Sequence, residues 1–245
     1  MQWRDEGILV SVRSHGETSA IIEVLCAEHG RHAGVVRGGA SRRMKAFLQP
    51  GADVSVTWSA RLETHMGAFV VEPVRSRMAA LLQDRMALEA VNCVCALVCW
   101  ALPEREAMEG FYHETKALLD RICRDEGWLA DYVAWEMSLL NELGFGLDLS
   151  ACAATGVNED LAFVSPKSGR AVSREGAGPW ADRLLDLPAF LTPRGGPTDS
   201  QAITAGLRLT GFFLDSRAAI ALGRDKLPAA RARLVSLVER AAKPA

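Results

Sequence analysis

The sequence lacks an uninterrupted apolar run long enough to span a bilayer, which requires about 20 residues. Its most apolar stretch, residues 87–102, is shorter than that and contains Glu89 and Asn92. The first six residues include three charged side chains and no apolar core, so they do not read as a secretion signal. We therefore expect a soluble, cytoplasmic protein with no membrane partner, associated with the nucleoid if it binds DNA.

Common catalytic motifs are missing as well. The chain contains no Gly-x-Ser-x-Gly nucleophile turn and no Gly-x-x-x-x-Gly-Lys-Ser/Thr phosphate loop. His15, His29 and His32 flank predicted turns, where a surface position is more common than a catalytic one. We expect no enzyme and assign no catalytic residue, and a hydrolase is the least favoured of the functions considered.

The cysteines are not spaced as metal ligands. Cys93, Cys95 and Cys99 lie in one apolar, helix-like run without nearby histidines, which is typical of small core residues. Cys152 stands alone, whereas a structural zinc ion needs four ligands. We therefore expect no metal and no cofactor.

Charge is distributed unevenly along the 245 residues, although the formal net charge is only −2. Residues 1–78 hold ten basic and eight acidic side chains, residues 103–186 hold eight and sixteen, and residues 187–245 hold nine and four. Basic ends favour a polyanionic ligand, and the acidic middle favours a different kind of contact.

Acidic residues are absent between Arg31 and Ala52, where six basic or histidine side chains occur. They are Arg31, His32, Arg37, Arg42, Arg43 and Lys45. Such a segment beside the Gly38-Gly39 turn is suited to a phosphate backbone, because its cations need not be neutralised internally. A solvated, charged loop is the alternative.

The first 78 residues alternate apolar and polar side chains between turn residues, which predicts strands. The expected strands cover residues 7–13, 19–26, 30–36, 52–58 and 67–71. Five short strands in such a span predict a small barrel of the oligonucleotide-binding (OB) type, with an SH3-like barrel as the competing fold.

From Met78 onward the apolar period becomes helical, so residues 79–245 predict an α-helical domain. The expected helices cover a segment from about Leu88 to Leu102 and residues 104–124, 128–143, 200–222 and 228–242. Residues 146–198 lack this period and contain a predicted β-hairpin at 163–172. The fold class is therefore α+β.

The order of several short motifs resembles a known family. They are Val36-Arg37-Gly38-Gly39-Ala40-Ser41-Arg42-Arg43, Leu48-Gln49-Pro50-Gly51, Leu143-Gly144-Phe145-Gly146-Leu147-Asp148-Leu149 and Val164-Ser165-Pro166-Lys167-Ser168-Gly169-Arg170-Ala171-Val172-Ser173. Over nearly its whole length the chain resembles the bacterial DNA repair protein family RecO, and the last motif resembles its alphaproteobacterial branch.

This resemblance implies an N-terminal OB domain, a helical C-terminal domain and no nucleotide hydrolysis. It also implies binding of single- and double-stranded DNA, annealing of complementary strands, and loading of RecA onto strands coated by single-stranded-DNA-binding protein (SSB). The implied protein partners are RecR, the C-terminal tail of SSB and, in some bacteria, RecF.

One departure from the family concerns a zinc element built from two Cys-x-x-Cys pairs. The corresponding positions here hold Cys152, Thr155, Ser173 and Gly176. Because three of the four ligands are missing, we predict no zinc. We expect the hairpin to be held by packing of Leu161, Phe163, Val164 and Val172.

The residue pattern yields two candidate basic surfaces. The predicted DNA-binding residues are Arg31, Arg37, Arg42, Arg43, Lys45 and Phe47, extended by Arg61, Arg75 and Arg77. The second set, for the SSB tail or for more DNA, is Arg208, Arg217, Arg224, Lys226, Arg231 and Arg233. Phe47 is the preferred base-stacking aromatic over Trp3, Trp58 and Phe69, which are more typical of a core.

A non-catalytic protein–protein adaptor is the alternative function. In that case the acidic middle, with Glu104, Glu106, Glu109 and Glu114, binds a basic partner and the barrel binds no nucleic acid.

Overall fold

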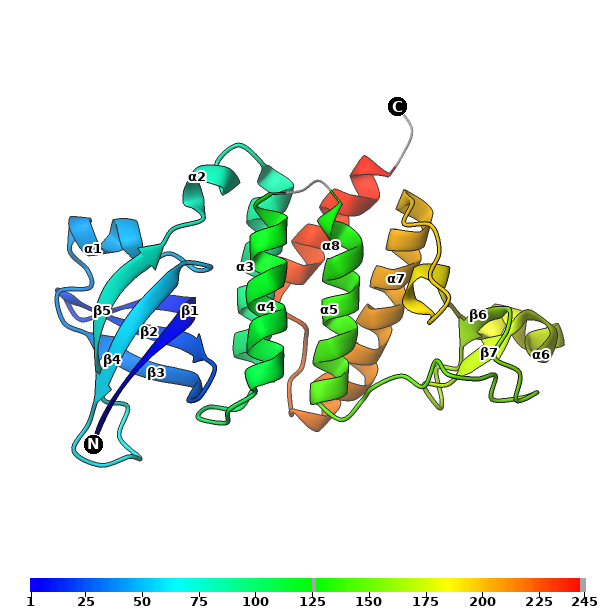
Figure 1. Ribbon diagram of the computed structural model, residues 1–245, viewed down its shortest axis with the longest axis horizontal. Helices are drawn as coiled ribbons and strands as arrows, with labels where there is room; N and C mark the ends of the chain where they lie inside the picture. The colour runs from blue at the N-terminus through cyan, green and yellow to red at the C-terminus, as the bar shows by residue number, and fades with distance from the viewer. Residues whose placement is uncertain (125–126, 243–245) are drawn as a thin grey trace. The chain divides into compact units, whose positions relative to one another are not determined.

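Five strands near the N-terminus close into a barrel in the computed structural model, which describes residues 1–124 and 127–242 (Figure 1). The strands are β1 (Gln2–His15), β2 (Ser19–Cys26), β3 (Gly30–Val36), β4 (Asp53–Ser59) and β5 (Ala68–Arg75). They follow one another around the barrel in the order β1-β2-β3-β5-β4. All neighbours are antiparallel except β3 and β5, which close the ring through a parallel contact.

The barrel forms because its strands alternate as the sequence predicts. On β4, Val54, Val56 and Trp58 are buried, while Ser55 and Thr57 between them are partly exposed. Successive side chains of a strand point to opposite faces, so the apolar set fills the interior. The closed five-stranded barrel, followed by helices and a small sheet, confirms the predicted α+β class with an OB-type N-terminal domain.

Two longer helices accompany the barrel, α3 (Arg85–Ala101) and α4 (Glu109–Ile122). Asp84 begins α3, because its carboxylate accepts hydrogen bonds from the N–H groups of Met86 and Ala87. The apolar face of α3 packs against β1. The Val91 side chain of α3 also lies close to Gly51, in the turn before β4. The three cysteines of this helix are largely buried and form no disulfide.

The predicted helix 104–124 is too long at its start. Residues 103–108 are not helical, because Glu104 forms a parallel bridge with Arg31 and the Arg105 N–H donates to the Arg31 carbonyl. The bridge to the start of β3 therefore keeps this segment out of the helix, and Arg105 adopts a positive φ of 65° there. Two short helices were not predicted, α1 (Arg42–Phe47) within the basic segment and α2 (Met78–Leu81).

The remaining helices are α5 (Trp128–Glu142), α6 (Arg174–Ala177), α7 (Ser200–Phe213) and α8 (Ala229–Ala241). A π-helical turn at Leu214–Ala219 continues α7, so the predicted helix 200–222 is not regular throughout. The predicted hairpin is present as β6 (Leu161–Val164) and β7 (Ala171–Ser173), and β8 (Leu185–Asp186) joins the free edge of β6. Two 3₁₀ helices lie at Gly178–Arg183 and Ala189–Leu191.

The chain divides into two compact units, residues 1–125 (unit 1) and 126–245 (unit 2). Unit 1 contains the barrel together with α1–α4, and unit 2 contains α5–α8 and the small sheet. The boundary predicted after residue 78 falls inside unit 1, where the barrel ends and α2 begins. Among the described residues, no helix is long and apolar enough to cross a membrane.

Candidate nucleic-acid interface

The basic segment after β3 folds into a short helix that presents cations to solvent. A turn at Gly38, which has a positive φ of 72°, leads to Ser41, whose hydroxyl accepts a hydrogen bond from the Met44 N–H. Met44 packs against the barrel core and Leu48 is buried in it. Those two anchors leave the opposite side of α1 exposed, and that side carries Arg42, Arg43 and Lys45.

A shallow hollow of about 510 Å³ lies beside the parallel β3–β5 contact. The end of β3 contributes Val35 and Arg37, and the β4–β5 connection contributes Arg61 and His65. The fold thus brings together two arginines that are 24 positions apart in the sequence, both of them predicted DNA-binding residues.

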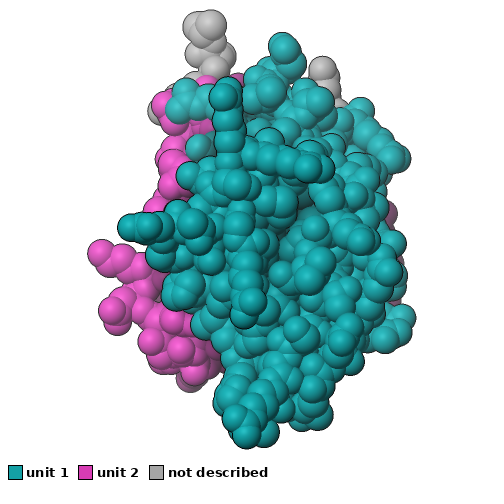
Figure 2. Space-filling view, turned by 90° about the vertical axis from the view of Figure 1, so that its left-hand side faces the viewer, with its two compact units in different colours: residues 1–125 teal, residues 126–245 magenta. Residues whose placement is uncertain are grey.

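Five of the predicted cations have no carboxylate partner within the described part of the chain. They are Arg37, Arg42, Arg43, Lys45 and Arg61, and all five are exposed. Unpaired, exposed cations can exchange counterions for phosphates without breaking an internal ion pair. We call these five residues the barrel cations; Figure 2 shows the surface of unit 1 from the side of the barrel.

Arg31 lies differently from the barrel cations, because acidic side chains surround it. Its guanidinium pairs with Glu23 on β2 and lies 3.8 Å from Glu104, while Nε donates to the Leu102 carbonyl at 3.0 Å. Only 11% of the side chain is exposed. Arg31 therefore fastens the barrel to the segment that follows α3, and we leave it out of the proposed binding surface.

Arg75 and Arg77 lie together at the junction between β5 and α4. Both pair with Asp53 of β4 and with Asp120 of α4, and Arg77 also donates to the Gly51 carbonyl. Burial raises the pKa of Asp120, but hydrogen bonds and charge from Arg77 and Arg75 outweigh this and lower the pKa below its usual value. Both arginines hold the helix to the barrel, so we leave them out of the surface as well.

Among the predicted stacking aromatics, Phe47 is the exposed one. Trp58 and Phe69 are buried in the barrel core, and Trp3 packs against it while stacking on His29 with ring centroids 3.9 Å apart. Phe47 is 39% exposed and follows Lys45 on α1. Its position permits base stacking next to the barrel cations.

The second predicted basic set does not form one surface. Arg231 is buried and donates from Nε and Nη2 to the Glu136 carboxylate at 2.7 and 2.8 Å. Arg217 donates to the carbonyls of Pro166 and Lys167. Arg208 lies 3.8 Å from Glu239 and remains largely exposed. Arg224, Lys226 and Arg233 are exposed.

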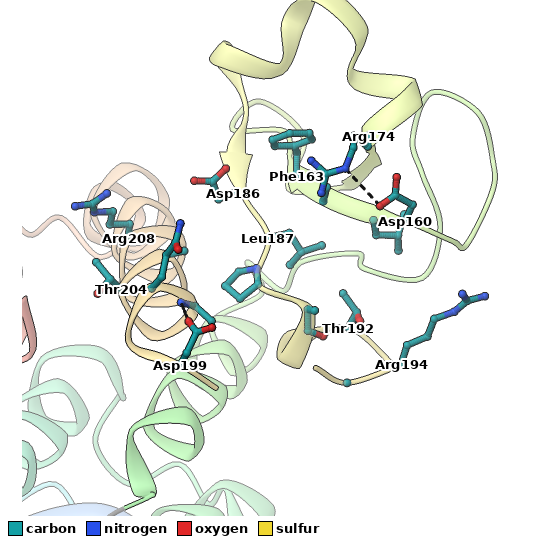
Figure 3. A pocket seen from close by; sticks show the side chains of 18 of the residues that line it. Asp160, Phe163, Arg174, Asp186, Leu187, Thr192, Arg194, Asp199, Thr204 and Arg208 are labelled. Atoms are coloured by element: carbon teal, nitrogen blue, oxygen red, sulfur yellow. Dashed lines mark hydrogen bonds and ion pairs between the residues drawn. The ribbon is translucent and has the colours of Figure 1, made fainter. Parts of the chain in front are cut away.

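Arg208 instead lines a hollow of unit 2 that has a volume of about 1010 Å³ (Figure 3). Its walls come from β6, from the residues after β8 and from the first turns of α7. Leu187 lies between Arg208 on one side and the Arg174–Asp160 pair on the other. We call this hollow the α7 pocket; its apolar residues lie among charged ones.

The four positions that correspond to the zinc pattern, Cys152, Thr155, Ser173 and Gly176, lie around the sulfur of Cys152. The Sγ of Cys152 accepts hydrogen bonds from the Ser173 N–H at 3.1 Å and from the Ser173 hydroxyl at 3.3 Å, and a Cβ added to Gly176 would lie 2.8 Å from it. Burial raises the pKa of the Cys152 thiol, but hydrogen bonds from Ser173 and Thr155 lower it to about 6. Hydrogen bonds from Ser173 and Thr155 and the close approach of Gly176 therefore bring together, around this sulfur, the positions that the resemblance aligns with zinc ligands.

The packing expected for this hairpin involves additional residues. Val172 and Cys152 form a small buried cluster with Ala177, against which Leu161 and Phe163 pack. Sequence reasoning did not name Ala177, which the short helix α6 supplies after the Ser173 cap. It also did not name His65 in the barrel hollow or the α7 pocket, because these sites join residues from separate loops.

A small OB-type barrel that presents unpaired cations beside an exposed aromatic is typical of nucleic-acid-binding proteins. Comparison with known proteins narrows this class. Residues 1–83 match the family model described as recombination protein O N terminal, and residues 82–225 match that of recombination protein O C terminal. The chain therefore belongs to the RecO family of DNA repair proteins.

Curated relatives match the chain along nearly its full length. Proteins named DNA repair protein RecO from Cereibacter sphaeroides and Dinoroseobacter shibae are 58% and 56% identical over 241 residues, which is 98% of this chain. They are covered over 100% and 99% of their own length. A Ruegeria relative of the same name is 55% identical over 240 residues.

Proposed function

We propose that this protein is a DNA-binding recombination mediator without catalytic activity of its own. In this proposal it binds single- and double-stranded DNA, anneals complementary strands and, with RecR, helps to load RecA onto SSB-coated strands. The observation that carries the proposal is the set of five exposed barrel cations with no carboxylate partner among the described residues. The family assignment supports the same role in DNA repair.

The chemistry of annealing follows from neutralised charge. Two complementary strands repel each other through their phosphates, and cations that replace condensed counterions reduce that repulsion. The contacts are to phosphates and not to base edges, so binding is independent of sequence. Phe47 adds a stacking face that accepts any base.

The test is a titration of the full chain with a fluorescently labelled single strand at several salt concentrations. The double variant Arg42→Ala/Arg43→Ala is expected to bind more weakly and to reduce the magnitude of the log–log salt slope by about 1.4, about 0.7 per lost contact to a single strand. The variant Arg85→Ala/Arg224→Ala removes the same charge from exposed sites outside the barrel and should leave the slope unchanged.

Two results would count against the proposal. If the α1 variant keeps both affinity and slope, the barrel cations do not contact DNA. If the unaltered protein shows no binding even at low salt, the adaptor alternative is favoured, with the acidic middle as its docking surface.

For the SSB tail, we propose the α7 pocket as the binding site. The SSB tail is acidic and ends in apolar residues. In the α7 pocket, Leu161 and Leu187 can contact the apolar end of the tail, and Arg208 can pair with one of its carboxylates. The ion pair between Arg208 and Glu239 is long, at 3.8 Å, so a carboxylate of the tail can replace Glu239 as the partner of the guanidinium.

Anisotropy of a labelled SSB-tail peptide measures this contact. Arg208→Glu is expected to weaken binding at least tenfold. Arg224 belongs to the same predicted basic set but lies outside the pocket, so Arg224→Glu should have little effect. The reverse order would place the tail outside the pocket.

A further inference from the structure

A second, smaller hollow in unit 2 lies where three segments meet, and it has a volume of about 170 Å³. Its walls are the loop 144–147 after α5, the β6–β7 turn at 167–169, and Phe213 and Arg217 from the end of α7 and its π-helical turn. Since about 15 Å³ of such space already admits a water molecule, the hollow has room for a phosphate group and its oxygens.

Glycines allow the backbone to form these walls. Gly144 and Gly169 have positive φ values of 79° and 71°, which side chains rarely adopt. A Cβ on Gly169 would lie 3.2 Å from Leu147, and a Cβ on Gly146 would lie 2.7 Å from the Asn141 side chain. The Asp148 N–H donates to the Gly169 carbonyl at 3.0 Å and ties the loop to the turn.

Two cations line this hollow, Lys167 from the turn and Arg217 from the π-helical turn. Neither forms an ion pair within the described ranges 1–124 and 127–242. Arg217 uses Nη2 to donate to the Lys167 carbonyl at 2.6 Å and to the Pro166 carbonyl at 3.3 Å, which fixes the guanidinium beside the turn. The nearby carboxylate of Asp148 is already paired with Arg170 at 3.2 Å.

Backbone donors are also present. Gly146 and Leu147 line the hollow, and in the described structure their N–H groups have no acceptor. Backbone N–H groups in a glycine-rich loop, together with Arg and Lys side chains, form the usual donor set for a phosphate group.

We propose that this hollow is a phosphate site that holds a backbone phosphate of DNA. The inference rests on the proposed DNA-binding function, and it gives unit 2 a polyanion contact separate from the barrel cations. A free phosphate ion has the same chemistry, and the experiment distinguishes the two sources.

Lysine acylation read by mass spectrometry provides the test, because the chain has only five lysines. Lys45 reports on α1, Lys167 reports on the hollow, and Lys116, which lies 5.9 Å from the Tyr112 ring centroid on α4, serves as the reference. We expect an oligonucleotide to slow acylation of Lys45 and Lys167 several-fold and to leave Lys116 unchanged. Inorganic phosphate at the same phosphate concentration should protect neither lysine, because a single ion lacks the multiple contacts of a strand.

The outcomes separate the two claims. Protection of Lys45 without Lys167 overturns the phosphate site and leaves the proposed function intact, and protection of neither overturns both. Equal protection of Lys167 by inorganic phosphate overturns the assignment to DNA. As a second measurement, Lys167→Ala should reduce the magnitude of the salt slope of single-strand binding by about 0.7, whereas the matched Arg224→Ala should not.

Discussion

His32 is a buried side chain whose two ring nitrogens have no hydrogen-bond partner among the described residues. It packs edge-on against Trp58, with ring centroids 4.8 Å apart, and contacts Trp3 and Phe69 in the same way. Burial and the positive charges of Arg105 and His29 lower the pKa of His32 to about 4. The barrel core therefore accepts this imidazole only in its neutral form.

This burial predicts a pH-dependent stability. Between pH 6.5 and about 4 the unfolded chain binds a proton at His32 that the folded chain does not, so the free energy of unfolding falls as pH falls through this window. The total loss is about 3 kcal/mol, complete below the folded pKa. Urea unfolding at several pH values should show that His32→Leu removes most of this slope, whereas replacing the exposed His65 does not. Identical slopes for His32→Leu and the unaltered protein would contradict the assignment.

Arg231 belongs to a buried network in unit 2. Glu136 is fully buried and accepts hydrogen bonds from Arg231, from the Thr210 hydroxyl and, at 2.6 Å, from the Tyr132 hydroxyl. The sequence offered no means to separate Arg231 from the exposed Arg233 two positions later, because Glu136 lies 95 positions away. Its pairing with Glu136 removes Arg231 from any ligand surface and gives it a structural role.

The network predicts a strong effect of breaking one partner. Arg231→Met leaves the Glu136 carboxylate buried without a counter-charge, which should cost about 3–5 kcal/mol of unfolding free energy. Adding Glu136→Gln removes that charge and should recover a large part of the loss. Urea unfolding of the two single variants and the double variant measures the coupling, and an equally unstable double variant would exclude an uncompensated charge as the cause.

At the scale of elements, the presence of the five barrel strands was predictable because their signal is local, although β1 begins five residues earlier than predicted and β5 ends four residues later. The alternating residues of 52–58 correspond to β4 at Asp53–Ser59, within one residue at each end. Residues 103–108 were not predictable, since their non-helical form depends on a bridge to Arg31 about 70 positions earlier. The π-helical turn after α7 likewise left no sign in the apolar period.

The candidate nucleic-acid interface was likewise predictable only in part. The sequence located the acid-free cations near α1, but it did not tell them from Arg75 and Arg77, whose partner Asp120 lies on α4. A rule based on local charge therefore identifies unpaired cations only where no carboxylate distant in the sequence pairs with them.

Helix α1 begins at a side-chain cap, Ser41, whose contribution to the helix can be tested. Ser41→Ala removes the acceptor for the Met44 N–H, and loss of such a cap costs about 1 kcal/mol of local helix stability. Amide exchange at Met44 and Lys45 should become about fivefold faster, a ratio that corresponds to that energy. Ser14→Ala, at an exposed position on β1, is the control. Unchanged exchange at Met44 would show that anchoring by Leu48 alone holds the helix.

At the scale of the whole molecule, the net charge of −2 opposes binding to a polyanion. Any attraction must come from local cations, and pairing with carboxylates has already removed Arg31, Arg75, Arg77 and Arg231 from that set. Of the cations proposed to contact DNA, the barrel cations on unit 1 and the two cations of the hollow lined by Lys167 and Arg217 on unit 2 form no ion pair within the described residues. A protein of this kind should bind DNA through a few contacts, each sensitive to salt.

The number of contacts fixes the expected salt dependence. Five phosphate contacts give a log–log slope of about −3.5 for single strands and about −4.5 for duplex DNA, because counterion release per contact differs between them. Engagement of Lys167 and Arg217 would bring the single-strand slope to about −5. Anisotropy titrations of the full chain with a single strand and its duplex, each over a tenfold range of salt, measure both slopes. A slope near zero would exclude phosphate contacts, whereas a slope near −10 would require many cations beyond these seven to contact the strand.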